Sequence, residues 1–314
     1  MADAYDLELR RAALDRVRQL QTRFDDLIPL AALKQGFEYD GHRLSFGSFY
    51  VGIYRSAAQH GPAALCLVTA APKVGRPAPY EDAFDEARQE FSYRFRDAQK
   101  DTAAARRAAD ADNRALVEAH RLGVPLIYFR GIAPGQYAAV APIVITAVDE
   151  VARLVRFQAT LPLADTSERG VVSAPETRRY ATREAVYRLH QHRFRAAVLR
   201  AYSSRCAVCS LRETSLLEAS HIIEDRDSRG EATVVNGISL CAIHHLAYDR
   251  NLMGIDPEGV VHIAGRLLRE IDGPMLKSGL QEFHGARILA PRRVDERPDP
   301  RRLEGRFGRF EQVA

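Results

Sequence analysis

The chain has 314 residues, with 45 lysine and arginine side chains against 41 aspartate and glutamate side chains, and a formal net charge of +4. Hydrophobic residues make up 46% and charged residues 27%, which is ordinary for a globular protein with two domains. No apolar run reaches membrane-spanning length and the charged N-terminus is unlike a secretory signal, so we expect a cytoplasmic protein without a membrane partner.

The first 36 residues predict a helical segment. Apolar side chains recur at helical spacing from Leu7 to Leu27, and Pro29 breaks or kinks the pattern. Residues 1–36 carry no pattern that indicates catalysis, so we expect this segment to serve packing or dimerisation.

Residues 37–165 have a different texture. Short runs rich in valine, isoleucine, tyrosine and phenylalanine alternate with glycine and proline, which predicts strands. One helix is expected from Thr102 to Leu122, with Gly123 as its stop. Six or so strands with one or two helices predict a small barrel, closed or half closed.

The order of these elements resembles the SRA (SET- and RING-associated) domain, one of the PUA-like barrels that read modified bases in DNA. Four stretches carry the resemblance: G-S-F-Y-V-G-I-Y-R-S-A-A-Q-H-G-P-A-A-L-C-L-V, P-Y-E-D-A-F-D, F-S-Y-R-F and D-N-R-A-L-V-E-A-H-R-L-G-V-P-L-I-Y-F-R-G-I. The resemblance implies that a flipped base stacks between Tyr80 and Tyr93, and that Asp82 accepts a hydrogen bond from a cytosine amino group. The alternative is that both tyrosines are core aromatics on strands.

A polar stretch and a basic helix follow. Residues 166–180 read as a linker, because they are polar and contain Gly170 and Pro175. A helix is expected from Thr182, its N-cap, to about Tyr202. Eight arginines and one glutamate lie between residues 178 and 205, and four of the arginines are candidates for binding the DNA backbone: Arg188, Arg193, Arg195 and Arg200. The alternative is an ordinary solvated helix face.

Two ligand pairs with two-residue spacers predict a structural zinc site. The pairs are Cys206 with Cys209, and Cys241 with His244. Thiolate and imidazole are the ligands that Zn²⁺ prefers, and four of them complete a tetrahedral site. The remaining cysteine, Cys66, lies in an apolar run and is expected to be a buried, inert thiol.

The residues between and beside these pairs resemble the HNH endonuclease family, whose core is a β-hairpin and a helix around a catalytic metal (ββα-metal). The resemblance covers residues 181–290. It implies that His221 is the general base that activates water, that Asn236 orients the hairpin, and that His245 binds the catalytic cation. A neutral imidazole accepts a proton near pH 7, and a divalent cation such as Mg²⁺ stabilises charge on the phosphate.

The second protein ligand of that cation is less clear from the sequence. The family commonly places Asp or His just before the first His, where this chain has Ser220, a poor ligand. Asp249 lies four residues after His245, on the same face of the expected helix, and is our first choice. Glu218 is the reserve candidate.

Residues after Asp249 predict a hairpin closed by D-P-E-G, and residues 291–314 read as an extended basic tail rich in arginine and proline. The sequence thus predicts an α+β protein with a PUA/SRA-like barrel followed by a zinc-stabilised HNH domain.

The expected function is a modification-dependent endonuclease that cuts double-stranded DNA carrying 5-methyl- or 5-hydroxymethylcytosine. A homodimer would supply two sites for a double-strand break. Two alternatives stay open: an HNH nuclease acting on unmodified DNA or RNA, and a non-catalytic zinc protein that binds DNA.

Overall fold

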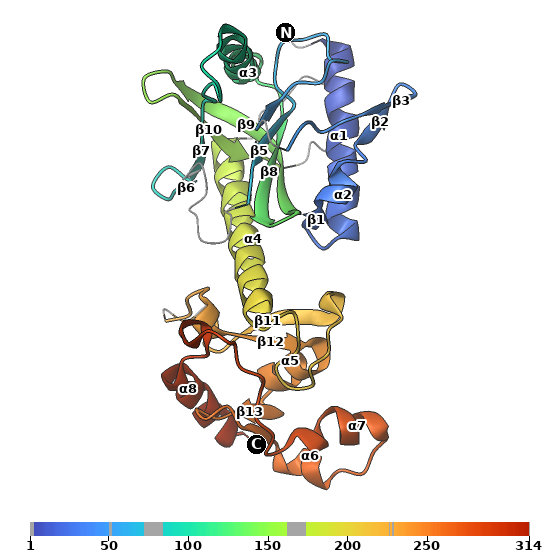
Figure 1. Cartoon of the computed structure of the whole chain (residues 1–314), viewed down its shortest axis with the longest axis vertical. Coiled ribbons are helices and arrows are strands. Elements are labelled where there is room, and N and C mark those ends of the chain that lie inside the picture. The colour runs from blue at the N-terminus through green and yellow to red at the C-terminus, as the bar shows by residue number, and fades with distance from the viewer. Residues whose placement is uncertain are drawn as a thin grey trace. The chain divides into compact units, whose positions relative to one another are not determined.

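The computed structural model describes residues 3–49, 52–71, 84–161, 174–225, 227 and 229–313 (Figure 1). The chain forms two compact units, Met1–Leu189 and His190–Ala314, and combines helices with strands in both. None of the helices within these ranges is long and apolar enough to cross a membrane.

One mixed sheet forms the centre of the first unit. Its strands are β1 (Leu27–Pro29), β4 (Ile53–Tyr54), β5 (Cys66–Thr69), β6 (Phe84–Asp85), β7 (Glu90–Arg94), β8 (Leu126–Ala133), β9 (Gln136–Asp149) and β10 (Leu154–Ala159). The order is β4-β5-β8-β9-β10-β7-β6, with β1 beside the first residues of β9, and only β5 and β8 run parallel. A separate hairpin joins β2 (Phe37–Tyr39) to β3 (His42–Leu44).

The expected closed barrel is not found among the described residues. The sheet order ends at β4 on one side and at β6 on the other, and these two strands do not pair with each other in the described ranges. Closure would need a pairing between strands that lie far apart in the sequence, and a pattern of strand runs contains no information about that pairing. The strand-rich composition is nevertheless confirmed.

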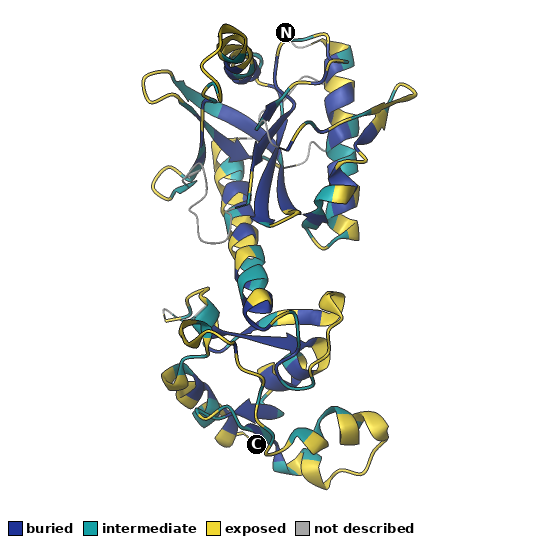
Figure 2. Cartoon of the chain, viewed as in Figure 1, coloured by how far each residue is buried: buried dark blue, intermediate teal, exposed yellow. Residues whose placement is uncertain are grey.

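Three helices precede α4 (Pro175–Ala201) in the described part of the first unit: α1 (Ala4–Arg23), α2 (Leu30–Leu33) and α3 (Ala103–Leu122). The predicted bounds of α3 are confirmed, because Thr102 accepts a hydrogen bond from the Ala105 amide and Gly123 ends the helix in the left-handed region at φ 62°. Four fully buried apolar side chains of α1 pack into the core of this unit: Leu9, Ala13, Val17 and Leu20. Buried residues are dark blue in Figure 2.

A long helix, α4 (Pro175–Ala201), begins seven residues before the expected start. Residues 175–180 are therefore helical, although the sequence reads as a linker there. Thr182 does not cap the helix. Its hydroxyl accepts a hydrogen bond from the Ala159 amide at 2.9 Å and is fully buried in the first unit.

The second unit contains a hairpin followed by a helix. Strands β11 (Leu217–His221) and β12 (Gly237–Cys241) are antiparallel, with Leu217 opposite Cys241 and His221 opposite Gly237. Helix α5 (Ala242–Asp249) follows β12 without a loop. The expected ββα arrangement is therefore present, and its core is formed by buried aliphatic and aromatic side chains of the same unit.

The rest of the second unit folds around this element. The predicted hairpin is confirmed as β13 (Met253–Ile255) and β14 (Val261–Ile263). Two short helices follow, α6 (Gly265–Arg269) and α7 (Pro274–Gly279). The expectation of an extended C-terminal arm is wrong, because Pro300–Glu311 form the helix α8, whose residues Leu303 and Phe310 are buried.

Candidate active site and metal centre

His221 is the last residue of β11 and packs against α4. The ring of Phe194 on α4 stacks on the His221 ring, with centroids 4.0 Å apart and an interplanar angle of 18°. Opposite His221, a Cβ on Gly237 would lie 2.4 Å from Val198 and 2.9 Å from Phe194, so glycine lets α4 pack closely against the hairpin.

The protonation of His221 follows from this burial. Burial lowers the pKa of His221 below its ordinary value, the carboxylates of Asp225 and Asp249 raise it, and His245 lowers it. The ring is therefore neutral at pH 7. Its Nε2 atom is enclosed and has no hydrogen-bond partner within the described ranges. His245 and Asp249 of α5 are thus among the groups whose charge acts on the His221 ring.

Asn236 fixes the loop that follows His221. Its side chain is fully buried, and its Oδ1 accepts a hydrogen bond from the Ile223 amide at 2.9 Å. Its Nδ2 donates to the carbonyls of Ile223 and Glu231 at 3.0 and 2.9 Å. All the polar atoms of the side chain are thus used to hold backbone, which is the geometry that a hairpin-orienting residue needs.

His245 lies between two carboxylates. Its Nδ1 contacts Oε2 of Glu218 on β11, and its Nε2 lies 3.3 Å from Oδ2 of Asp249 on α5. The His245 side chain is 24% exposed, whereas both carboxylates are more than half exposed, so the group is open to solvent. Ser220 is fully buried in the hairpin. The structure therefore brings both candidate carboxylates to the same imidazole, one to each nitrogen.

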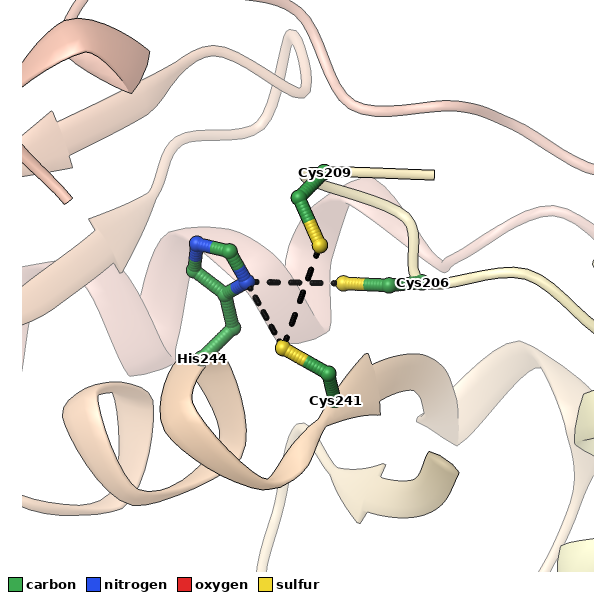
Figure 3. Close-up of side chains that lie close together, drawn as sticks. All are labelled: Cys206, Cys209, Cys241 and His244. Atoms are coloured by element: carbon green, nitrogen blue, oxygen red, sulfur yellow. Dashed lines mark hydrogen bonds between the residues drawn. The ribbon is translucent and has the colours of Figure 1, made fainter. Parts of the chain in front are cut away.

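The four predicted zinc ligands converge in one cluster, as Figure 3 shows. Cys206 and Cys209 come from the turn after α4, Cys241 is the last residue of β12, and His244 lies in the first turn of α5. Nδ1 of His244 lies 3.1 Å from Sγ of Cys241 and 3.5 Å from Sγ of Cys206, and the sulfurs of Cys209 and Cys241 are 3.9 Å apart. A tetrahedral zinc site requires sulfur–sulfur and sulfur–nitrogen separations of about 3.8 and 3.5 Å.

The donor set therefore fits Zn²⁺ in both chemistry and spacing. Hydrogen bonding from Cys241 lowers the pKa of the Cys206 thiol, with a further contribution from His244, so one thiolate is already favoured. His244 is 2% exposed and meets the edge of the Phe283 ring at 5.3 Å between centroids. An ion held here would join the turn before the hairpin to the first turn of α5, the helix that carries His245.

The four candidate DNA-binding arginines have different surroundings. Arg195 donates to the carbonyls of Thr214 and Leu217 at 3.0 and 2.9 Å, so it supports the entry to β11. Arg188 lies 3.7 Å from Asp26, and Arg200 lies 3.8 Å from Glu296, while both keep more than half of the side chain exposed. Arg193 is also exposed. The structure thus gives Arg195 a supporting contact that the sequence did not indicate.

Of the three predicted base-binding residues, Tyr80 and Asp82 lie outside the residues that the structure describes. Tyr93 on β7 is 8% exposed, and its hydroxyl donates to the carbonyl of Val68 at 3.2 Å. A Cβ on Gly52 would lie 2.6 Å from that hydroxyl, so the backbone approaches the ring closely. These contacts are those of a residue packed in the interior.

Comparison with known proteins identifies the second unit's motif. Residues 206–256 match the HNH endonuclease family. No curated protein matches the chain. A solved structure of a modification-dependent TagI restriction endonuclease is similar over 92% of this chain and 88% of that one, at 16% identity and a TM-score of 0.26.

Proposed function

We propose that this chain is a DNA endonuclease that hydrolyses phosphodiester bonds at an HNH site in its second unit, with the help of a divalent cation. The observation that carries the proposal is the β11–β12 hairpin followed by α5, inside the segment that matches the HNH family. This element contains His221, Asn236 and His245. The substrate would be double-stranded DNA.

In this proposal His221 accepts a proton from the attacking water. A general base must be unprotonated, and burial, to which the Phe194 stack contributes, lowers the pKa of this imidazole so that it is neutral at pH 7. Because Nε2 is enclosed, Nδ1 is the atom that accepts the proton. Asn236 keeps the base at the end of β11 by holding the backbone that follows it.

His245 and Asp249 would hold the catalytic cation, which stabilises charge on the phosphate and the leaving oxygen when bound. One imidazole offers one nitrogen to an ion and donates through the other, commonly to a carboxylate. Asp249 lies at Nε2 and acts electrostatically on His221, so we assign the cation to this side of the ring. Glu218 then accepts the hydrogen bond from Nδ1 and orients the ring.

The zinc cluster and the arginines would support this site. Zn²⁺ on Cys206, Cys209, Cys241 and His244 would keep α5 against the hairpin. Exposed arginines of α4, among them Arg188, Arg193 and Arg200, would bind backbone phosphates. A single site cuts one strand, so a double-strand break would require two copies of the chain, and we propose a homodimer for that step.

The first unit would select the substrate. The order of its elements in the sequence resembles the SRA domain, and on that ground we propose that residues 37–165 read 5-methyl- or 5-hydroxymethylcytosine, with residues 181–290 as the nuclease domain. Tyr80 and Asp82 are the proposed base contacts, and Tyr93 is the third candidate that the sequence offers. The burial of Tyr93 favours a packing role for that residue. We therefore propose Tyr80 as the main stacking residue.

Digestion of plasmids from methylating, hydroxymethylating and unmodified hosts, with magnesium present, tests both parts. Cutting of the modified plasmids alone supports the whole proposal. Equal cutting of all plasmids keeps the nuclease and removes the selection of modified cytosine. No cutting with magnesium, manganese, nickel or cobalt, together with DNA binding in a gel shift, favours a non-catalytic zinc protein instead.

A further inference from the structure

The C-terminal helix α8 packs firmly into the second unit. Gly254 of β13 has no side chain where Phe310 packs, and a Cβ there would lie 2.6 Å from the Phe310 ring. Leu303 and Arg306 are buried on the same helix. This helix lies outside residues 206–256, the segment that matches the HNH family. The contacts that α8 makes with the site therefore come from outside the matched segment, which contains the β11–β12 hairpin and α5.

Arg306 closes the C-terminal end of α5. Its guanidinium lies 4.6 Å from the centroid of the Tyr248 ring and donates hydrogen bonds to the Tyr248 carbonyl and to Oδ1 of Asn251. The last carbonyls of a helix have no partners within the helix, and a cation is favoured at that end. Tyr248 immediately precedes Asp249. Arg306 is 7% exposed, so this contact is enclosed.

The charge of Asp249 also acts on the Arg306 guanidinium. Burial lowers the pKa of Arg306, and Tyr248 and Asp249 oppose that shift. Asp249 is the last residue of α5, and its carboxylate lies 3.3 Å from Nε2 of His245. Arg306 therefore binds the carbonyl of the residue before Asp249 and is also influenced by the Asp249 charge.

The same helix holds the loop between β11 and β12. Arg302 donates to the carbonyl of Arg229 at 2.8 Å and lies 3.3 Å from the carboxylate of Glu231. At the start of α8, the Asp299 amide donates to the carbonyl of Val235 at 3.0 Å. Glu231 is in turn a backbone partner of Asn236. The contacts of α8 thus reach the segment that follows His221 as well as the end of α5.

We propose that α8 is a brace between the two halves of the active site, and that Arg306 is a positioning residue that holds the Asp249 end of α5 against the His221 hairpin. The mechanical part of this inference rests on the contacts alone. Its effect on catalysis rests on the proposed nuclease function.

Three full-length variants test the brace. Arg306→Met removes the charge and the hydrogen bonds and keeps a long stem on the Tyr248 ring, whereas Arg306→Lys keeps the charge. Arg301→Met is the matched control, because Arg301 is exposed on the same helix. The measurements are amide hydrogen exchange of α5, Mn²⁺ binding by electron paramagnetic resonance, zinc content, and cleavage over a range of cation concentrations.

For Arg306→Met we expect faster exchange confined to the last turn of α5 and Mn²⁺ affinity weakened about tenfold, a typical loss when a group behind a ligand is removed. Excess cation should restore the cleavage rate, Arg306→Lys should be intermediate, and Arg301→Met should equal the wild type. A merely structural loss would lower the active fraction equally at every cation concentration.

Unchanged amide exchange of α5 in Arg306→Met overturns the proposal, because the Arg306 contact then does not stabilise the end of this helix. A uniform loss of protection and zinc across the unit also overturns it, since Arg306 would then maintain the whole fold. A wild-type protein that binds Mn²⁺ and cuts no DNA removes the nuclease function instead, and the exchange and Mn²⁺ results still decide whether α8 is a brace.

Discussion

The ring of Phe194 covers one face of the His221 imidazole at 4.0 Å between centroids. Burial of the imidazole, to which this stack contributes, is the main cause of the lowered pKa of His221. Because the neutral form is the base, a lower pKa extends activity to more acidic pH, so the acid limb of the pH–rate profile should lie below about 6.5, the ordinary histidine value. His221 has a higher pKa in the unfolded chain than in the folded protein, so the unfolded chain binds a proton more tightly. Lowering the pH below about 6.5, the ordinary histidine pKa, therefore also lowers the stability of the fold.

Phe194→Leu should hydrate the ring and move the acid limb upward, toward the ordinary value. Single-turnover cleavage at saturating magnesium, measured between pH 5 and 8 (about the range over which histidine titrates), would show the shift. Phe157→Leu makes the same change at a fully buried phenylalanine of β10 in the first unit and should leave the limb in place. An unmoved limb in Phe194→Leu would mean that this contact does not set the protonation of the base.

His221→Ala should strongly reduce the cleavage rate while DNA binding and zinc content stay at the wild-type level. General base catalysis contributes about 10²–10⁴-fold to a rate, and a loss of that size is expected in a nicking assay. His262→Ala is the control, because His262 pairs with Asp256 in the β13–β14 hairpin and has no proposed catalytic role. Full activity in His221→Ala would exclude His221 as the base.

Substitution at the two carboxylates should reveal which nitrogen of His245 binds the cation. Asp249→Asn neutralises the proposed ligand at Nε2 and should raise the magnesium concentration for half-maximal activity by roughly tenfold or more. Glu218→Gln keeps an oxygen that accepts the Nδ1 proton, so its effect should be several times smaller. The opposite order would place the cation at Nδ1 with Glu218.

The zinc quartet and the His-Asn-His series were accessible from the sequence because metal geometry and the hairpin–helix motif fix the spacing of these residues. The helix α3 was also accessible, since Thr102 and Gly123 end it through local hydrogen bonds and backbone conformation. Features determined by neighbours in the chain therefore needed no knowledge of the tertiary structure.

Other features depend on residues distant in the sequence. The stack of Phe194 on His221 joins α4 to β11, and Phe194 reads only as one member of an apolar stripe. Proline is tolerated in the first turn of a helix, which is why Pro175 reads equally as a linker residue and as the start of α4. Helix α8 was not predicted, because its many arginines make the segment read as a basic tail. Its buried residues Leu303, Arg306 and Phe310 nevertheless recur at helical spacing.

Tyr93 distinguishes a packed core from a base-reading pocket. If its ring stacks on a flipped base, Tyr93→Phe should keep the preference for modified DNA and Tyr93→Ala should lose it, since stacking contributes about 1–3 kcal/mol per base. Given its burial, we expect both variants to keep the preference and Tyr93→Ala to lower the melting temperature. Competition gel shifts with modified and unmodified duplexes, beside thermal melts, make the comparison.

Zinc removal should unfold the second unit without affecting the first. Structural zinc contributes about 10–16 kcal/mol of apparent binding free energy in small zinc-binding peptides, so Cys206→Ser should lose the ion and the protection of the β11–β12 hairpin from amide exchange. Cys66→Ala is the matched control, because Cys66 is fully buried in β5 of the first unit, whereas the quartet belongs to the second unit. Its zinc content should stay at one ion per chain. A Cys206→Ser protein that keeps wild-type melting and hairpin protection would mean that the hairpin and α5 are held by their apolar core rather than by the ion.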